Sequence, residues 1–146
     1  MTTPTRRAAL HAAAAGLALG LLPAAAAAQS STAKNKLVLQ VSDNDSGKWG
    51  LALNNARNVQ LDLDAENVDI EIVVYGPGIS MLKGDSPLAQ RISAALKTGI
   101  KVVACENTMK GLHLTYADML PDIGYVPAGV VELMQKQQQG YAYVRP

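Results

Sequence analysis

Short apolar runs alternate with helix-like segments over most of the chain, and this alternation limits the possible folds more than any other feature. The apolar runs cover residues 37–41, 68–75, 100–104, 125–126 and 141–144. Short apolar runs that end at polar, glycine or proline residues are typical of buried strands. Strands that alternate with helices through short loops form βαβ units, whose strands run parallel. We therefore expect a three-layer α/β/α sandwich with a mostly parallel sheet of about five strands.

The segment after residue 48 predicts the first helix. Its apolar side chains recur at steps of three and four residues, which places them on one helix face; they are Trp49, Ala52, Ala56, Val59 and Leu63. Asp45 or Ser46 is expected to cap the amino end of this helix, because both residue types accept hydrogen bonds from free N–H groups.

Four further helical regions are expected. Ser86 as N-cap and Pro87 at the first helical position predict the start of the second helix, and Gly99 is placed to end it. Its predicted buried face consists of Leu88, Ile92, Ala95 and Leu96. Later helical stretches are expected at residues 107–112, 116–120 and 127–139, with Gly140 capping the last one.

The first 28 residues have the order of a secretory signal peptide. Arg6 and Arg7 form a basic start, an apolar stretch covers residues 8–22, and a run of small residues ends at Ala28. The paired arginines also suit a twin-arginine export route, although Ala9 stands where a phenylalanine is common. The alternative is an uncleaved membrane anchor, but glycines and a proline interrupt the stretch.

The chain is accordingly divided into a signal peptide (1–28), a disordered linker (29–36) and one α/β domain (37–146). We expect a periplasmic or secreted protein with no stable membrane insertion after cleavage. The whole chain has 13 basic and 12 acidic residues, and without Arg6 and Arg7 the basic count is 11 against the same 12. This balance, without a basic cluster, argues against nucleic acid as a partner.

The expected site lies at the carboxyl edge of the sheet, where ligands of open parallel sheets bind. The predicted strands deliver residues 42–47, residues 76–80 and Cys105 to this edge. Cys105 is the single cysteine, so it has no partner for an intramolecular disulfide. A following helix would favour its thiolate through N–H groups and the helix dipole, whereas the adjacent Glu106 would oppose it. The alternative is an unreactive thiol that packs in the core.

Other kinds of site fit the sequence less well. In one continuous helix His113 would lie about 12 Å from Cys105, too far for a catalytic base. Asp43 and Asn44 superficially resemble part of a calcium loop, but Asn54 stands where a bidentate glutamate is required. One cysteine and one histidine after the leader do not make a zinc site, so we expect neither a metal nor a cofactor.

Three motifs, in this order and spacing, resemble the DsrE/DsrF-like family. The first is Val41-Ser42-Asp43-Asn44-Asp45 with Trp49, the second is Val73-Val74-Tyr75-Gly76-Pro77-Gly78-Ile79, and the third is Ala104-Cys105-Glu106-Asn107-Thr108-Met109. The ending Gly140-Tyr141-Ala142-Tyr143-Val144 is also similar. The resemblance implies a parallel five-stranded fold, homo- or hetero-oligomers such as trimers or hexamers, and sulfur held as a persulfide on Cys105.

The pocket beside this cysteine is expected to include Asp43, Asn44, Gly76, Gly78, Asn107 and Thr108. Of these, Gly76 and Gly78 belong to a Gly-Pro-Gly turn that either serves the fold alone or also lines the pocket. We expect a sulfur carrier that exchanges sulfur with donor and acceptor proteins. The alternative is a non-catalytic oligomeric binding or scaffold module in which Cys105 is structural. No hydrolase or oxidoreductase signature is present, so sulfur transfer is the most enzyme-like activity expected.

Overall fold

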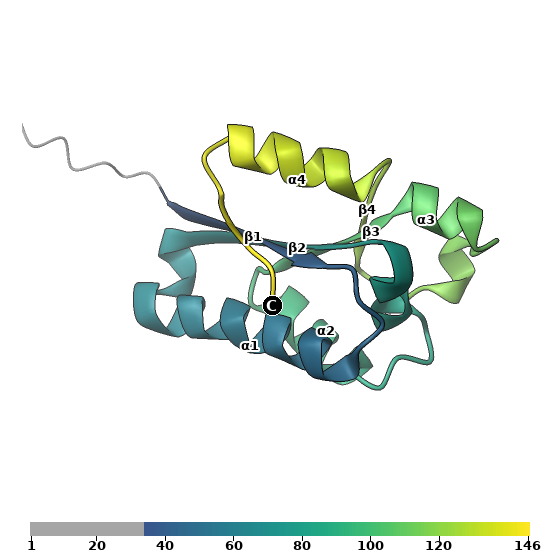
Figure 1. Cartoon of the computed structure of the whole chain (residues 1–146). Helices are drawn as coiled ribbons and strands as arrows, with labels where there is room; N and C mark the ends of the chain where they lie inside the picture. The colour runs from purple at the N-terminus through teal and green to yellow at the C-terminus, as the bar shows by residue number, and fades with distance from the viewer. Residues whose placement is uncertain (1–33) are drawn as a thin grey trace, which may run out of the picture. The chain divides into compact units, whose positions relative to one another are not determined.

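The computed structural model describes residues 34–146, which form a five-stranded sheet with helices on both faces (Figure 1). The predicted signal peptide and most of the predicted linker lie outside the described residues. The strands are β1 (Asn35–Val41), β2 (Val68–Val74), β3 (Lys101–Cys105), β4 (Gly124–Val126) and β5 (Ala142–Val144). All pair in parallel, in the order β4-β3-β2-β1-β5. This confirms the predicted α/β fold.

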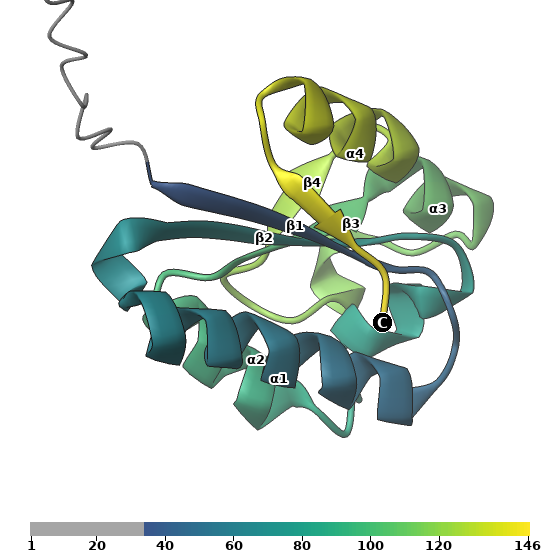
Figure 2. The ribbon, with the colours of Figure 1, turned by 60° about the vertical axis from the view of Figure 1, so that its left-hand side comes forward.

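Two helices cover one face of the sheet and one helix covers most of the other (Figures 1 and 2). Helices α1 (Ser46–Leu63) and α2 (Ala89–Lys97) lie on the first face, and α4 (Gly129–Gln138) lies on the second. The short α3 (Glu106–Gly111) continues directly from β3 at the carboxyl edge. No helix among residues 34–146 has the length and apolar character that crossing a membrane requires.

Because successive side chains of a strand point to opposite faces, the internal strands pack against both layers. Toward α1 and α2, β2 presents Ile70, Ile72 and Val74, which belong to a large apolar cluster. Toward α4 the apolar cluster is much smaller and consists of Val38, Val73, Val103, Leu133 and Tyr141. Tyr75 and Val126 pack against this smaller cluster, and the buried polar side chains Gln40 and Glu71 lie on the same face.

The helix ends follow the predicted signals in several places. Asp45 caps α1, with Oδ1 accepting from the N–H groups of Gly47 at 2.8 Å and Lys48 at 3.1 Å. Gly99 and Gly140 adopt φ values of +90° and +88°, which confirms their predicted role at helix carboxyl ends.

Four boundaries and one packing prediction differ from the sequence expectation. β1 begins at Asn35, two residues inside the predicted linker, because Asn35 pairs with Val68 on β2. The Gly-Pro-Gly segment opens a 3₁₀ helix, Gly76–Leu82, rather than forming only a turn. A shorter 3₁₀ helix, Tyr116–Asp118, replaces the expected helical stretch 116–120.

The second helix begins at Ala89, so the assignment of Ser86 as its N-cap was wrong. Ser86 instead forms a turn, in which its carbonyl accepts from Ala89 at 3.2 Å, and Leu88 accepts the first helical bond, from Ile92, at 2.9 Å. Leu63 lies at the end of the predicted apolar helix face but is not buried with it. It is 43% exposed, because the last turn of α1 lies beside an open hollow near the start of β1.

Candidate functional site

The three loops expected at the site come together because β1, β2 and β3 are neighbours in the sheet. Backbone hydrogen bonds join the first two loops, from Tyr75 N–H to Val41 O and from Gly78 N–H to Ser42 O, each at 3.1 Å. The third loop is joined to the second by Gly76 N–H, which donates to Thr108 Oγ1 at 2.9 Å. The carboxyl ends of the three strands therefore form one continuous edge.

Gly78 brings the first two loops close to each other. A Cβ atom on Gly78 would lie 2.7 Å from Val41 O and 3.0 Å from Ser42 Cα, distances that no side chain tolerates. The role of Gly78 in the structure is thus to allow backbone contact. Gly76 has a φ of +55°, a left-handed conformation that favours glycine, and it presents its N–H to Thr108.

Cys105 is the last residue of β3 and its side chain faces the layer of α4. It shares this face with Val103, two positions earlier, which belongs to the small cluster beneath α4. The side chain is buried, with 5% of its surface exposed. The thiol therefore lies at the carboxyl edge of the sheet, beneath the amino-terminal end of α4.

Polar groups around the sulfur favour its charged form. Burial raises the pKa of the Cys105 thiol, but hydrogen bonds from the Thr108 side chain and from the backbone of Gly129, Thr108 and Asn107 outweigh this effect. The net pKa is below that of an ordinary cysteine. These N–H groups belong to the first turns of α3 and α4, and the positive ends of helix dipoles add to their effect.

Thr108 connects the thiol to the second loop. Its Oγ1 accepts from Gly76 N–H, which leaves the hydroxyl proton to be donated to the sulfur. Thr108 is half-buried, and a hydroxyl that has both kinds of partner is held in one orientation. Of the predicted pocket residues, Thr108 is therefore the one whose side chain hydrogen-bonds the sulfur of Cys105.

Asn107 has a different place from the one expected for a sulfur ligand. Its side chain is exposed, and its backbone N–H donates to Pro127 O at 3.2 Å as well as contributing to the thiol environment. Asn107 thus joins the start of α3 to the segment that leads into α4.

Gly129 and Tyr75 belong to the site but were missing from the sequence prediction. A Cβ atom on Gly129 would lie 2.9 Å from Tyr75 Cβ, so α4 begins in close contact with the end of β2. A usable signal existed: Pro127-Ala128-Gly129 follows a predicted strand, and the parallel sheet brings the end of that strand to the same edge as Cys105.

Asp43 and Asn44 lie at the same edge but make no hydrogen bond to Cys105 among the described contacts. Asp43 forms ion pairs with Lys48 at 2.9 Å and with Arg145 at 3.2 Å. Hydrogen bonds from these two side chains lower its pKa, and its carbonyl accepts from Trp49 Nε1 at 2.7 Å. Asn44 is exposed. These two residues therefore organise the end of β1.

Glu106 follows the thiol directly but is engaged elsewhere. Its carboxylate accepts a hydrogen bond from the Tyr116 hydroxyl, and Tyr116 packs edge-on against Tyr125. A hollow of about 310 Å³ adjoins this pair, and its lining also includes Met109 and Lys110. His113 lies past the end of α3 and is exposed, with a φ of +55°.

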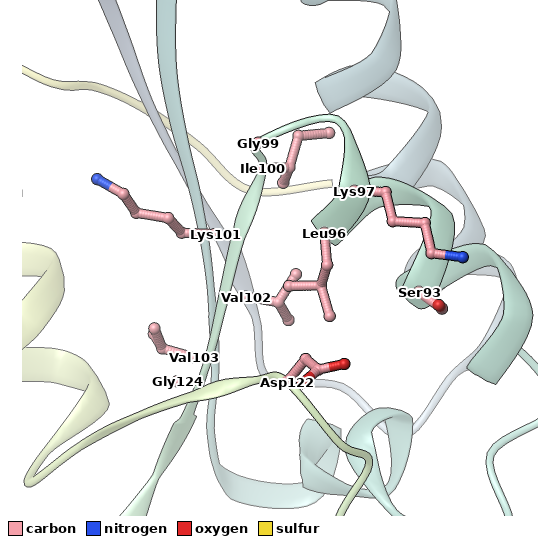
Figure 3. Close-up of a pocket in the computed structure, with 10 residues that line it drawn as sticks. All are labelled: Ser93, Leu96, Lys97, Gly99, Ile100, Lys101, Val102, Val103, Asp122 and Gly124. Atoms are coloured by element: carbon pink, nitrogen blue, oxygen red, sulfur yellow. The ribbon is translucent and has the colours of Figure 1, made fainter.

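A larger hollow, of about 570 Å³, lies away from the predicted site (Figure 3). It is lined by Ile100 and Val102 of the β3 region, by Leu96 of α2 and by Asp122, and no predicted site residue borders it. Figure 3 shows the ammonium groups of Lys97 and Lys101 directed away from it on opposite sides. The lining of this hollow contains no cysteine, and no histidine that could act as a base for Ser93, so the thiol at the carboxyl edge is the better candidate. No group of three metal-binding side chains occurs among residues 34–146.

Comparison with known proteins agrees with this architecture. The family model described as DsrE/DsrF-like family matches residues 2–146. MTH1491 of Methanobacterium thermoautotrophicum, a protein described as of unknown function, is 31% identical, with a TM-score of 0.74 over 77% of this chain and 100% of that chain. No curated protein matches the chain.

Two more distant structures share the fold alone. The ychN protein of E. coli is 15% identical, with a TM-score of 0.60 over 78% of this chain and 99% of that one. BT1422 of Bacteroides thetaiotaomicron is 14% identical, with a TM-score of 0.61 over 77% of this chain and 95% of that one. The family match, the parallel five-stranded sheet and the cysteine at its carboxyl edge lead to one conclusion: the chain belongs to the DsrE/DsrF-like family.

Proposed function

We propose that this protein is a sulfur carrier that holds sulfane sulfur as a persulfide on Cys105. The observation that carries the proposal is the set of donors at the sulfur: backbone N–H groups from the first turns of two helices and the Thr108 hydroxyl together lower the thiol pKa. The thiolate is the nucleophilic form of cysteine, and a lowered pKa increases its share near neutral pH. Family membership is consistent with sulfur relay at the level of the family.

The proposed transfer is an exchange at sulfur without net oxidation. The Cys105 thiolate attacks the outer sulfur of a donor persulfide, R–S–SH, and forms a new S–S bond. The S–S bond of the donor breaks, and the electron pair leaves with R–S⁻, which takes up a proton. In the second step a thiolate of the acceptor attacks the outer sulfur on Cys105, and the Cys105 thiolate is released. The same donors that stabilise the thiolate also make it a good leaving group.

The test is uptake of one sulfur by the purified protein. Incubation with a polysulfide donor is expected to add about 32 Da, the mass of one sulfur atom, to the intact protein, and Cys105→Ser is expected to show no gain. Thr108→Val, which keeps the side-chain shape, is expected to slow the uptake at neutral pH. Thr98→Val is the matched control, because the Thr98 hydroxyl bonds Ala95 O at the end of α2. A wild-type protein that gains no mass would contradict the proposal.

The second candidate is a non-catalytic oligomeric binding or scaffold module. The 5% exposure of Cys105 favours it, because a sealed thiol reacts slowly. Native-state labelling separates the two candidates. A carrier is expected to react with a small maleimide without denaturant. The pH midpoint of its labelling rate is expected to lie below that of a free cysteine. A scaffold module is expected to label only after unfolding and to keep its assembly in Cys105→Ala.

We also propose a homo-oligomer, a trimer or a hexamer. Apolar side chains stand exposed on the outer side of α4, including Val130 at 56%, Val131 at 45% and Met134 at 54%. Tyr143 and Val144 on the edge strand β5 are 42% and 38% exposed. Light scattering after gel filtration measures the mass in solution, and Met134→Glu is expected to lower it. A monomeric wild-type protein at micromolar concentration would exclude this assembly.

Export to the periplasm or the medium completes the proposal. Its support is the basic and apolar order of residues 1–28 together with the small residues before Gln29. Fractionation of cells that express the full chain, followed by mass analysis, is expected to find a product outside the cytoplasm that begins near Gln29. Arg6→Lys with Arg7→Lys is expected to block export if the twin-arginine route is used.

A further inference from the structure

Helix α4 buries two of its residues, Gly129 and Leu133, so each contact that holds it to the sheet is important for the thiol beneath its first turn. These contacts include Gly129 against Tyr75, Leu133 in the small apolar cluster, and Lys136 against Glu71 of β2. Positions 129, 133 and 136 recur at steps of four and three and so share one face of the helix. By contrast, α1 buries five residues.

The ion pair at the far end of α4 is buried. Glu71 is 3% exposed, and its Oε2 lies 2.8 Å from Lys136 Nζ. Lys136 also approaches Glu132 at 3.6 Å, one turn earlier on α4, and lies 4.9 Å from the ring centroid of Tyr141. The other carboxylate oxygen of Glu71, Oε1, is buried and has no hydrogen-bond partner among the described residues. A buried carboxylate oxygen without a hydrogen-bond partner is costly, so the pair is not explained by stability alone.

We infer that Glu71 and Lys136 are positioning residues of the thiol site, because their ion pair holds α4 at the place where Gly129 N–H reaches the sulfur of Cys105. The inference rests on the thiol chemistry of the proposed function. Gly129 and Lys136 are seven residues apart, about 10 Å along the helix, so neither charged group touches the sulfur. Their effect on the thiol passes through the placement of the helix.

Glu71 and Lys136 could change the pKa of Cys105 in two ways, by placing α4 or by acting directly on the thiol through their charges. These two effects can be distinguished, because they predict different signs for the pKa shift. Asp69 of β2 lies on the same face and is bound by Lys101 at 3.1 Å and by the Tyr141 hydroxyl at 2.5 Å. If only the charges mattered, loss of the negative Glu71 would lower the thiol pKa and loss of the positive Lys136 would raise it. A displaced α4 removes an N–H donor in both cases, so both changes would raise it.

The experiment measures the pH midpoint of thiol labelling in the native full-length protein. Glu71→Gln and Lys136→Met are each expected to raise the labelling midpoint by about one pH unit. At a pH below the midpoints of both wild type and variant, the variant then has about tenfold less thiolate. The double variant Glu71→Met/Lys136→Met replaces the pair by apolar side chains and is expected to restore the midpoint. Lys101→Met is the matched control, because Lys101 does not contact α4 in any described ion pair, and its midpoint is expected to stay unchanged.

Opposite shifts in the two single variants, or unchanged midpoints with normal circular dichroism, would overturn the inference. Lys136→Met leaves the buried carboxylate of Glu71 without its partner, so this variant could fail to fold. In that case the sign of the midpoint shift in Glu71→Gln decides the question alone. Glu71→Gln is suited to this role because the amide keeps the shape of the side chain. Sulfur uptake is measured separately. A wild-type protein that takes up no sulfur while the midpoints move as expected refutes the carrier function and supports the positioning role.

Discussion

The face of the sheet under α1 and α2 and the face under α4 differ in chemistry, although the same strands supply both. The first face is apolar throughout and contains the large cluster, whereas the second combines a small cluster with Gln40, Glu71 and Cys105. Along β2 and β3 this separation follows from the two-residue period of a strand. One face can hold the fold together, so the other can tolerate a buried ion pair and a thiol.

The largest effect is expected from a pair of neighbours on β2 that point to opposite faces. Ile72 and Val73 are both fully buried, Ile72 in the large cluster and Val73 in the small one. Ile72→Ala is expected to lower the free energy of unfolding by about 3–4 kcal/mol without moving the midpoint of thiol labelling. Val73→Ala is expected to cost about 2 kcal/mol and to raise that midpoint, since it loosens the packing of α4.

Urea unfolding and pH-dependent labelling of both variants measure the two quantities. If Ile72→Ala moved the thiol midpoint as much as Val73→Ala, the two faces would not be independent, and the comparison would fail.

A smaller loss is expected where α4 meets the sheet. In Gly129→Ala the added methyl group would lie 2.9 Å from Tyr75 Cβ, so the first turn of α4 has to shift. We expect about 1–3 kcal/mol of lost stability and a higher thiol pKa, because the N–H of residue 129 moves away from the sulfur. Gly111→Ala, at the end of α3, is the control: nothing lies within 4 Å of its added Cβ atom. A normal thiol midpoint in Gly129→Ala would show that α4 does not contribute to the site.

A still smaller effect is expected in the pH dependence of stability. The folded pKa of Cys105 lies below the ordinary value of a cysteine thiol, so thiolate formation stabilises the fold above the folded pKa. The stability of wild type relative to Cys105→Ser is therefore expected to rise as pH increases from the folded pKa toward the pKa of an unfolded cysteine, and to level off above that value. This added stability is lost as pH falls through the folded pKa. Urea unfolding of both proteins at a series of pH values measures this difference, and a falling difference would contradict the assigned direction.

The smallest effect is expected at the end of β1. Asp43→Asn removes solvent-exposed ion pairs with Lys48 and Arg145, and exposed pairs contribute little to stability because water and salt screen them. Sulfur uptake is expected to stay at the wild-type rate, because Asp43 makes no described contact with the thiol. A large loss of uptake in Asp43→Asn would extend the site from the end of β3 to the end of β1.

Much of the fold was readable from the sequence because it depends on local periodicity. The runs around Val38, Ile72 and Val103 predicted the central strands, and the residues that follow them predicted the common edge. Leu63 shows the limit of this approach: the helical repeat continues through it, but its side chain borders an open hollow beside β1 and is exposed. Periodicity alone does not reveal where close packing ends.

The site was predicted less completely because its contacts join distant parts of the chain. Glu71 lies within an apolar run and finds its partner at Lys136, so no local pattern reveals the ion pair. Gly129 contacts Tyr75 only after β4 and α4 have been placed on the sheet. Cys105 and Thr108, by contrast, are three residues apart across the junction of a strand and a helix, and the sequence brings them together directly.

The position of β1 in the sheet has a consequence for the order of folding. Among residues 34–146, β1 is the first strand and β5 is the last, yet β1 lies between β2 and β5. Leu37 pairs with Ala142, so this strand pair closes only when residues 142–144 are available. Contacts between such distant residues slow folding, because a long loop has to be ordered first. During synthesis one side of β1 stays unpaired until the final residues emerge, and a ribosome-bound or truncated chain carries an open sheet edge there.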